Sequence, residues 1–162
     1  MQPLDRLFRD TLQDVYYAEL TVTAFLGRVS TEAQSPRLVN ALRLQTDHAA
    51  AQMRGLDEVF VLVGERYNGR SCPAIDGIVE HATTQMKNFR DSRAIDPALG
   101  SATRALQTYE IARLDELLMW AMTLGHNGTI QLFQEILDEK KAADIQLEEI
   151  DDELSTMSIV VK

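Results

Sequence analysis

Apolar residues recur every three or four positions along most of this chain, which is the spacing of one face of an α-helix. The pattern predicts helices over about residues 3–29, 36–63, 74–90, 97–124 and 128–154. Glycine and proline fall mainly between these segments, and no segment shows the two-residue alternation of a half-buried strand. The sequence therefore predicts an all-α protein.

Two of the predicted helices have clear starting signals. Ser35-Pro36 and Asp96-Pro97 each place a good N-cap residue directly before a proline. Proline fits the first turn of a helix because its missing N–H would be unpaired there in any case. We therefore expect helices to start at these two sites.

The lengths of the connections predict how the helices are arranged. Short connections join the first long helix to the second and the third to the fourth, so each pair should form an antiparallel hairpin. The middle connection is longer and contains the short helix over about 74–90. Two hairpins joined by such a crossover form a four-helix bundle, as in the ferritin-like folds. We expect one domain covering residues 1–162.

The amino-acid composition limits the classes of molecule that this protein is expected to bind and the compartment in which it is expected to lie. The formal net charge is −9, which disfavours nucleic acids and anionic membranes because both attract basic surfaces. The single Cys72 cannot form an internal disulfide, which favours a reducing compartment. The charged N-terminus does not resemble a signal peptide, and no run approaches the ~20 apolar residues of a membrane span. We therefore expect a cytoplasmic protein.

Several polar residues interrupt the apolar stripes of the predicted helices. They are Glu19 on the first long helix, Gln45, His48 and Gln52 on the second, Glu110 on the third, and Lys140 and Asp144 on the fourth. Burying an unpaired charge costs several kcal/mol, so such groups pair, change protonation state or bind a metal ion. Counted from the predicted turns, all four long helices bring a polar side chain to mid-bundle height.

The two predicted hairpins place these residues alike. In each, a glutamate on the first helix is followed about 30 residues later by a polar pair four positions apart. Residues at i and i+4 share a helix face, and di-metal carboxylate bundles use similar arrangements. Taken singly, each residue is more often a hydrogen-bonded core group than a ligand. Taken together, they are equally compatible with a metal site and with a hydrogen-bonded polar core.

At these residues the sequence resembles the YciE/YciF family of bacterial ferritin-like proteins. The matching stretches are LFRDTLQDVYYAEL (7–20), QSPRL (34–38), QMRGLDEVFVLVGE (52–65), CPAIDGIVE (72–80), YEIARL (109–114) and DEKKAAD (138–144). The resemblance implies a ferritin-like bundle with an extra helix, a homodimer and a candidate di-metal site. It also implies an association with stress responses, but no settled reaction.

The resemblance carries over only part of the family's metal site. Glu19 and Glu110 match family glutamates, Gln52 matches a Gln/His position, and Asp144 matches the aspartate of the last helix. His48 and Lys140 stand where the family has glutamate. The imidazole of His48 can replace glutamate as a metal ligand, whereas the ammonium group of Lys140 has no lone pair to donate.

Two hypotheses follow for function, and the question of an enzyme stays open. In the first, Glu19, His48, Gln52, Glu110 and Asp144 bind iron or manganese, with one ion rather than two because of Lys140. Any redox chemistry would then be oxidation of the metal by dioxygen or peroxide. In the second, Lys140 forms salt bridges with the buried carboxylates, and the protein is a metal-free dimer acting as a structural or interaction module. The sequence indicates no catalytic residue.

Overall fold

The computed structural model describes residues 1–159, and this part of the chain forms five α-helices and one short 3₁₀ turn. The elements are α1 (Pro3–Glu32), α2 (Pro36–Leu62), α3 (Pro73–Phe89), α4 (Ile95–Leu124), η1 (Asn127–Thr129) and α5 (Ile130–Met157). The last three residues of the expected domain, 160–162, lie outside the described residues.

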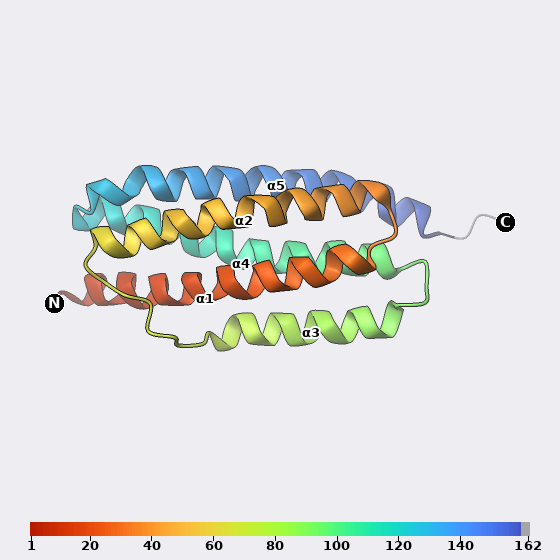
Figure 1. Cartoon of the computed structure of the whole chain (residues 1–162), viewed down its shortest axis with the longest axis horizontal. Coiled ribbons are helices and arrows are strands. Elements are labelled where there is room, and N and C mark those ends of the chain that lie inside the picture. The colour runs from red at the N-terminus through yellow and green to blue at the C-terminus, as the bar shows by residue number, and fades with distance from the viewer. Residues whose placement is uncertain (160–162) are drawn as a thin grey trace.

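The four long helices form a bundle of two antiparallel hairpins (Figure 1). Helix α1 lies beside α2 and α4, and α5 lies beside α4 and α2. Helix α3 packs along the outside of the bundle, mainly against α4, and returns the chain along its length. As a result, α2 and α4 run in the same direction. The expected all-α bundle with a helix in the crossover is confirmed.

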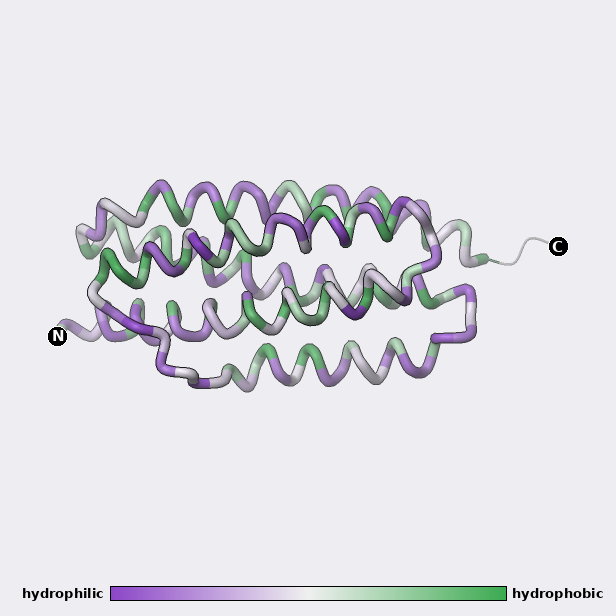
Figure 2. Tube along the Cα trace, in the orientation of Figure 1, coloured by the Kyte–Doolittle hydropathy of each residue, from purple (hydrophilic) through white to green (hydrophobic). Residues whose placement is uncertain are grey.

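The interior contains two apolar clusters with polar residues between them along the bundle axis. One cluster gathers around Phe25, Leu38 and Leu106, and the other around Phe8 and Phe133. Polar and apolar residues alternate along each helix at about the helical period (Figure 2). Five buried polar residues fall in sequence between the members of the two clusters, which places them near mid-bundle: Gln45, Gln52, Gln107, Glu110 and Lys140.

The second predicted cap behaves differently from expectation. Ser35 does cap α2, since its hydroxyl accepts a hydrogen bond from Leu38 N at 3.5 Å. Helix α4, however, begins at Ile95, so Asp96 lies inside its first turn. The Asp96 carboxylate instead accepts hydrogen bonds from Gln34 N at 2.8 Å and Ser35 N at 2.7 Å. The prediction that Asp96 caps its own helix was wrong, because the free N–H groups of the α1–α2 turn lie within its reach.

Other helix ends differ from the predicted ones by a few residues. Helix α1 continues to Glu32 rather than residue 29. The hydroxyls of Ser30 and Thr31 donate to the carbonyls of Gly27 and Arg28, at 3.1 and 2.7 Å, so the polar last turn is hydrogen-bonded. Helix α5 similarly runs on to Met157. No helix within residues 1–159 has the length and apolar character needed to cross a membrane.

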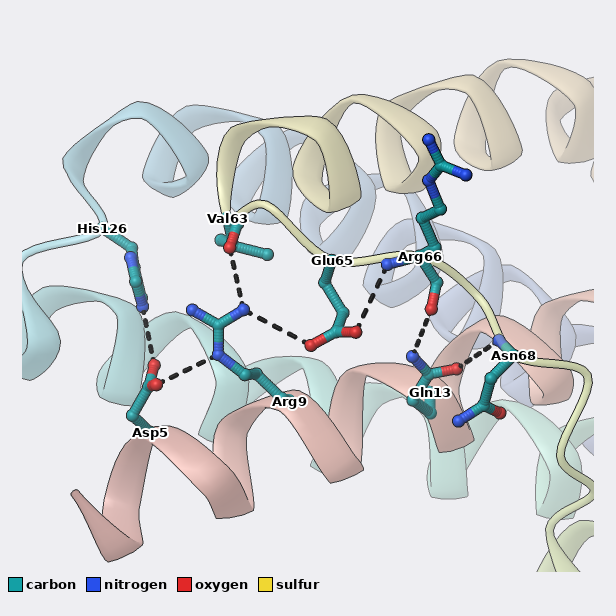
Figure 3. A network of polar contacts seen from close by, with 8 residues as sticks. All are labelled: Asp5, Arg9, Gln13, Val63, Glu65, Arg66, Asn68 and His126. Atoms are coloured by element: carbon teal, nitrogen blue, oxygen red, sulfur yellow. Dashed lines mark hydrogen bonds and ion pairs between the residues drawn. The ribbon is translucent and has the colours of Figure 1, made fainter. Parts of the chain in front are cut away.

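A polar network fastens the loop after α2 to the first half of α1 (Figure 3). The Arg9 guanidinium donates to the carbonyl of Val63 at 2.8 Å. The Gln13 amide donates to the carbonyl of Arg66 at 2.7 Å and accepts from Asn68 N at 3.0 Å. Because both side chains bond to backbone groups, they fix the path by which the chain leaves α2.

Candidate functional site

The centre of the bundle holds one lysine between two glutamates. Lys140 Nζ lies 2.7 Å from Glu19 Oε2 and 3.2 Å from Glu110 Oε2. The exposed fractions of the three side chains are 6%, 2% and 0%, respectively. Helices α5, α1 and α4 each contribute one member, so this trio joins three of the four bundle helices.

Helical periodicity directs each of these side chains inward. Glu19 follows the buried Val15 by one turn, and Glu110 precedes the buried Leu114 by one turn. Residues four apart share a helix face, so the two glutamates must point where their apolar neighbours point. The long stem of Lys140 packs in the interior and carries its ammonium group to both carboxyls.

Burial and charge push the protonation of the two glutamates in opposite directions. Burial raises the pKa of Glu110 well above its ordinary value, and the nearby Glu19 charge adds to this despite the opposing effect of Lys140. Burial also acts to raise the pKa of Glu19, but the charge of Lys140 and hydrogen bonding with Glu110 and Lys140 make the net shift a lowering. Burial disfavours the charged lysine, yet the two glutamates raise the pKa of Lys140 above its usual value.

The lack of aligned donors around the two carboxyls fits the same protonation pattern. If both carboxyls are ionised, three of their oxygens have no well-aligned hydrogen-bond donor within residues 1–159, namely Glu19 Oε2 and both oxygens of Glu110. Lys140 Nζ lies within ion-pair distance of both groups, but its geometry is not that of a hydrogen bond. A proton on Glu110 relieves this mismatch because a carboxylic acid can donate to Glu19. The trio is then neutral overall, with Lys140 and Glu19 charged and Glu110 protonated.

His48 and Gln52 belong to a second, more exposed cluster beside the trio. His48 Nδ1 lies 3.3 Å from Glu139 Oε1, and the Gln52 amide donates to the same oxygen at 2.6 Å. The side chains of His48 and Glu139 are 42% and 37% exposed. Members of both clusters, though not Glu110, line one cavity of about 20 Å³, which has room for at most one water molecule.

Asp144 points away from both clusters. Its Oδ1 accepts from Arg104 Nε at 3.1 Å, and its side chain is 22% exposed. The hydrogen bond that Arg104 donates to Asp144 is the main cause of the raised pKa of Arg104. Of the five predicted ligands, the structure therefore brings Glu19 and Glu110 together around Lys140, places His48 and Gln52 at Glu139, and separates Asp144.

Two members of this polar level were missed by sequence reasoning. The Gln107 amide donates to Gln45 Oε1, which links α4 to α2 across the interior. Gln107 lies three residues before Glu110, so its position on the same buried face was a usable signal. Glu139 gave no such signal, because it stands at the edge of the apolar stripe. Its polar contacts are with His48 and Gln52 on another helix, α2.

The arrangement can be compared with the needs of the expected iron or manganese centre. Among residues 1–159, no three His, Cys, Asp or Glu side chains are grouped so that they could hold a metal ion. The central carboxyls face a protonated lysine, which donates no lone pair and repels a nearby cation. As placed, the trio fits an ammonium group and not a metal ion beside it. The metal site stays a prediction.

The crossover-linked bundle, with buried glutamates on its first and third long helices, defines a ferritin-like helical protein. The chain belongs to the family described as Domain of unknown function (DUF892), whose model matches residues 3–159. The resemblance to the YciE/YciF family is thereby confirmed.

Three comparisons with relatives support this membership. Protein YciF of Escherichia coli (strain K12) is 26% identical over 151 residues, which is 93% of this chain and 91% of that protein. The crystal structure of the E. coli stress protein YciF matches with a TM-score of 0.89 and 25% identity, covering 96% and 99% of the two chains. YcfI of Rhodopseudomonas palustris matches with a TM-score of 0.86 and 33% identity, covering 91% and 94%.

Proposed function

We propose that this protein is a structural or interaction module of a stress response, and that Lys140 takes the central place that a metal ion holds in ferritin-like carboxylate proteins. The observation that carries the proposal is the contact of Lys140 Nζ with Glu19 at 2.7 Å and Glu110 at 3.2 Å. An internal cation already balances the buried carboxyls, so the bundle has no electrostatic need for a metal.

The size of the central cavity supports a role without catalysis at this level. The cavity has about 20 Å³, whereas binding pockets for small organic ligands occupy roughly 300–1,000 Å³. Its polar lining is largely committed to internal contacts, as the bonds of Gln52 to Glu139 and of Gln107 to Gln45 illustrate. An organic substrate would have to break several of these contacts to enter.

The biological setting is proposed from the relatives. YciF is named as a stress protein, and YcfI carries a provisional description as a structural protein. We carry both roles over to this chain. A cytoplasmic location fits them, and it fits Cys72, which is buried and free of disulfide bonds.

A second candidate function is a mid-bundle iron or manganese site. It is favoured by the two oxygens of Glu110, which are buried without an aligned hydrogen-bond donor when the group is ionised. Glu19, His48, Gln52, Glu110 and Asp144 remain its proposed ligands, and Lys140 would limit it to one ion. Such a site requires Lys140 and Asp144 to leave their present partners, which makes it the weaker candidate.

Thermal unfolding with and without Mn²⁺ or Fe²⁺ separates the two candidates. A ligand that binds only the folded state raises the melting temperature. We expect no metal-dependent rise in the parent, a rise in Lys140→Glu, and none in the control Lys141→Glu, whose side chain is exposed. A rise in the parent itself would refute the proposed function, and this arm holds even where Lys140→Glu folds poorly.

A further inference from the structure

Helix α3 is attached to the bundle along one side only. It packs mainly against α4, with a smaller contact to α1, and lies along the outside of the bundle (Figure 1). Three of its 17 residues are buried, namely Ile75, Ala82 and Met86. The two large side chains lie toward the ends of the helix, and the alanine lies between them. The contact between α3 and α4 is therefore well filled at both ends and thinly filled in the middle.

A cavity of about 150 Å³ lies in the middle of this contact. Ala98, Ala102 and Ala105 line it from α4, and Ile78 and Ala82 line it from α3. The three alanines of α4 are spaced four and three residues apart, so they share one face of that helix. Water that enters such a space finds few polar partners on these walls. The cavity is therefore suited to an apolar occupant.

The cavity has a closed floor and an open mouth. Ala82 and Ala102 are buried, at 3% and 8% exposure, and form its floor. Ala105 and two polar residues of the lining, His81 and Ser101, are exposed and border its mouth. A small molecule can therefore enter between the two helices while α3 stays folded.

The lining of the cavity restricts the class of molecule that it can bind. None of the eight lining residues is Asp, Glu, Lys or Arg, although the chain contains 25 acidic and 16 basic residues. An ion that entered would lose its hydration without gaining a counter-charge, so an uncharged ligand is favoured. The apolar floor and the polar mouth fit a molecule with an apolar body and one hydrogen-bonding group.

We propose that the cavity between α3 and α4 binds a small, uncharged, single-ring molecule that carries one hydroxyl group, such as phenol. An apolar cavity of about 150 Å³ takes one benzene ring, so the volume fits a single ring with a small substituent. The ring lies between the alanines of the two helices. Its hydroxyl group lies at the mouth, within reach of His81 and Ser101.

Occupation of the cavity links the crossover helix more firmly to the bundle. Because α3 has little other contact, a ligand held between α3 and α4 stabilises the docked position of α3. The inference goes beyond the proposed function and is independent of it, because the cavity shares no residue with the trio of Lys140, Glu19 and Glu110.

Titration of the isotope-labelled full-length chain with phenol, followed by NMR, tests the proposal. We expect saturable shifts of amide signals confined to the α3–α4 contact, with a dissociation constant of about 1 mM or below for a ligand of so few atoms. Ala102→Leu should weaken phenol binding by at least ~10-fold, because the added carbons occupy the space of the ring. The matched control Ala112→Leu lies on the exposed surface of α4, outside the cavity lining, and should leave binding unchanged.

Further variants separate loss of binding from misfolding and test the polar mouth. Ala82→Leu fills the cavity from α3, so it should also weaken phenol binding, and circular dichroism verifies that both cavity-filling variants remain helical. His81→Leu combined with Ser101→Ala should abolish the preference for phenol over benzene and leave benzene binding intact. The absence of saturable shifts in the parent, or undiminished phenol binding in both cavity-filling variants, would overturn the proposal.

Discussion

Two polar clusters share the middle of this bundle but differ in access to water. The trio of Lys140, Glu19 and Glu110 is almost fully buried. The neighbouring group of His48 and Glu139 is more than one-third exposed, at a similar contact distance of 3.3 Å. The two clusters are chemically similar, because in each a basic side chain contacts one or two carboxyl groups.

The difference lies in what water can replace. An exposed pair that loses one partner is solvated again, so its contribution is small. A buried pair that loses one partner leaves a charge without compensation. The inner cluster should therefore control the free energy of unfolding and its pH dependence, while the outer cluster should contribute little to either.

Removing the central cation should have the largest effect. Lys140→Met leaves the buried carboxylate of Glu19 without a counter-ion, and we expect a loss of about 3–5 kcal/mol in the free energy of unfolding at pH 7. The loss should shrink at lower pH, where the carboxyls take up protons. Urea unfolding measures it. The control Lys141→Met, on the exposed neighbour, should cost less than about 1 kcal/mol, and equal losses in the two variants would contradict the comparison.

The two glutamates should respond unequally to neutralisation. Glu19→Gln removes the ionised partner of Lys140 and should be strongly destabilising at pH 7. Glu110→Gln replaces a carboxyl whose raised pKa favours the protonated form, so its cost should stay below about 1 kcal/mol. Denaturant unfolding of both variants under one condition decides the order. The reverse order would mean that Glu110 carries the negative charge.

The pH dependence should differ between the parent and Glu110→Gln. Because the pKa of Glu110 is raised in the folded state, the unfolded chain releases this proton above about pH 4.5 while the folded chain keeps it. The Glu110 contribution therefore lowers stability as pH rises, by at most about 1.4 kcal/mol per pH unit. Glu19, whose folded pKa is lowered, stabilises above that pH and loses this contribution in acid.

Glu110→Gln lacks the first contribution, and it keeps the second because its amide can still donate a hydrogen bond to Glu19. Its stability relative to the parent should therefore increase between pH 5 and 7, which urea unfolding at several pH values can follow. A constant difference over this range would show that Glu110 titrates normally.

The outer cluster should give the smallest effect. His48→Ala and Glu139→Gln each remove one side of an exposed contact, so each should change stability by less than about 1 kcal/mol. Raising the salt concentration should reduce what remains of the effect, because exposed charges are screened. Chemical unfolding at low and high salt provides the measurement, and a loss as large as that of Lys140→Met would remove the distinction between the clusters.

Periodicity predicted the helices and the inward direction of Glu19 and Glu110, because helical spacing is a local property. It did not determine which polar residues meet. Four residues advance a helix by slightly more than one turn, so Asp144 is rotated from Lys140 toward the side where Arg104 competes for it. Asp96 shows the same limit, since its partners at the α1–α2 turn lie some 60 residues earlier. Such choices depend on tertiary packing.

Metal content tests the central claim, that Lys140 is the cation of the core, most directly. Tag-free protein would be analysed for metals as purified and after anaerobic loading with Fe²⁺ or Mn²⁺ and desalting, beside Glu110→Ala. The account predicts far less than one metal ion per chain in every sample. Retention of about one ion per chain by the parent, and its loss in Glu110→Ala, would contradict it.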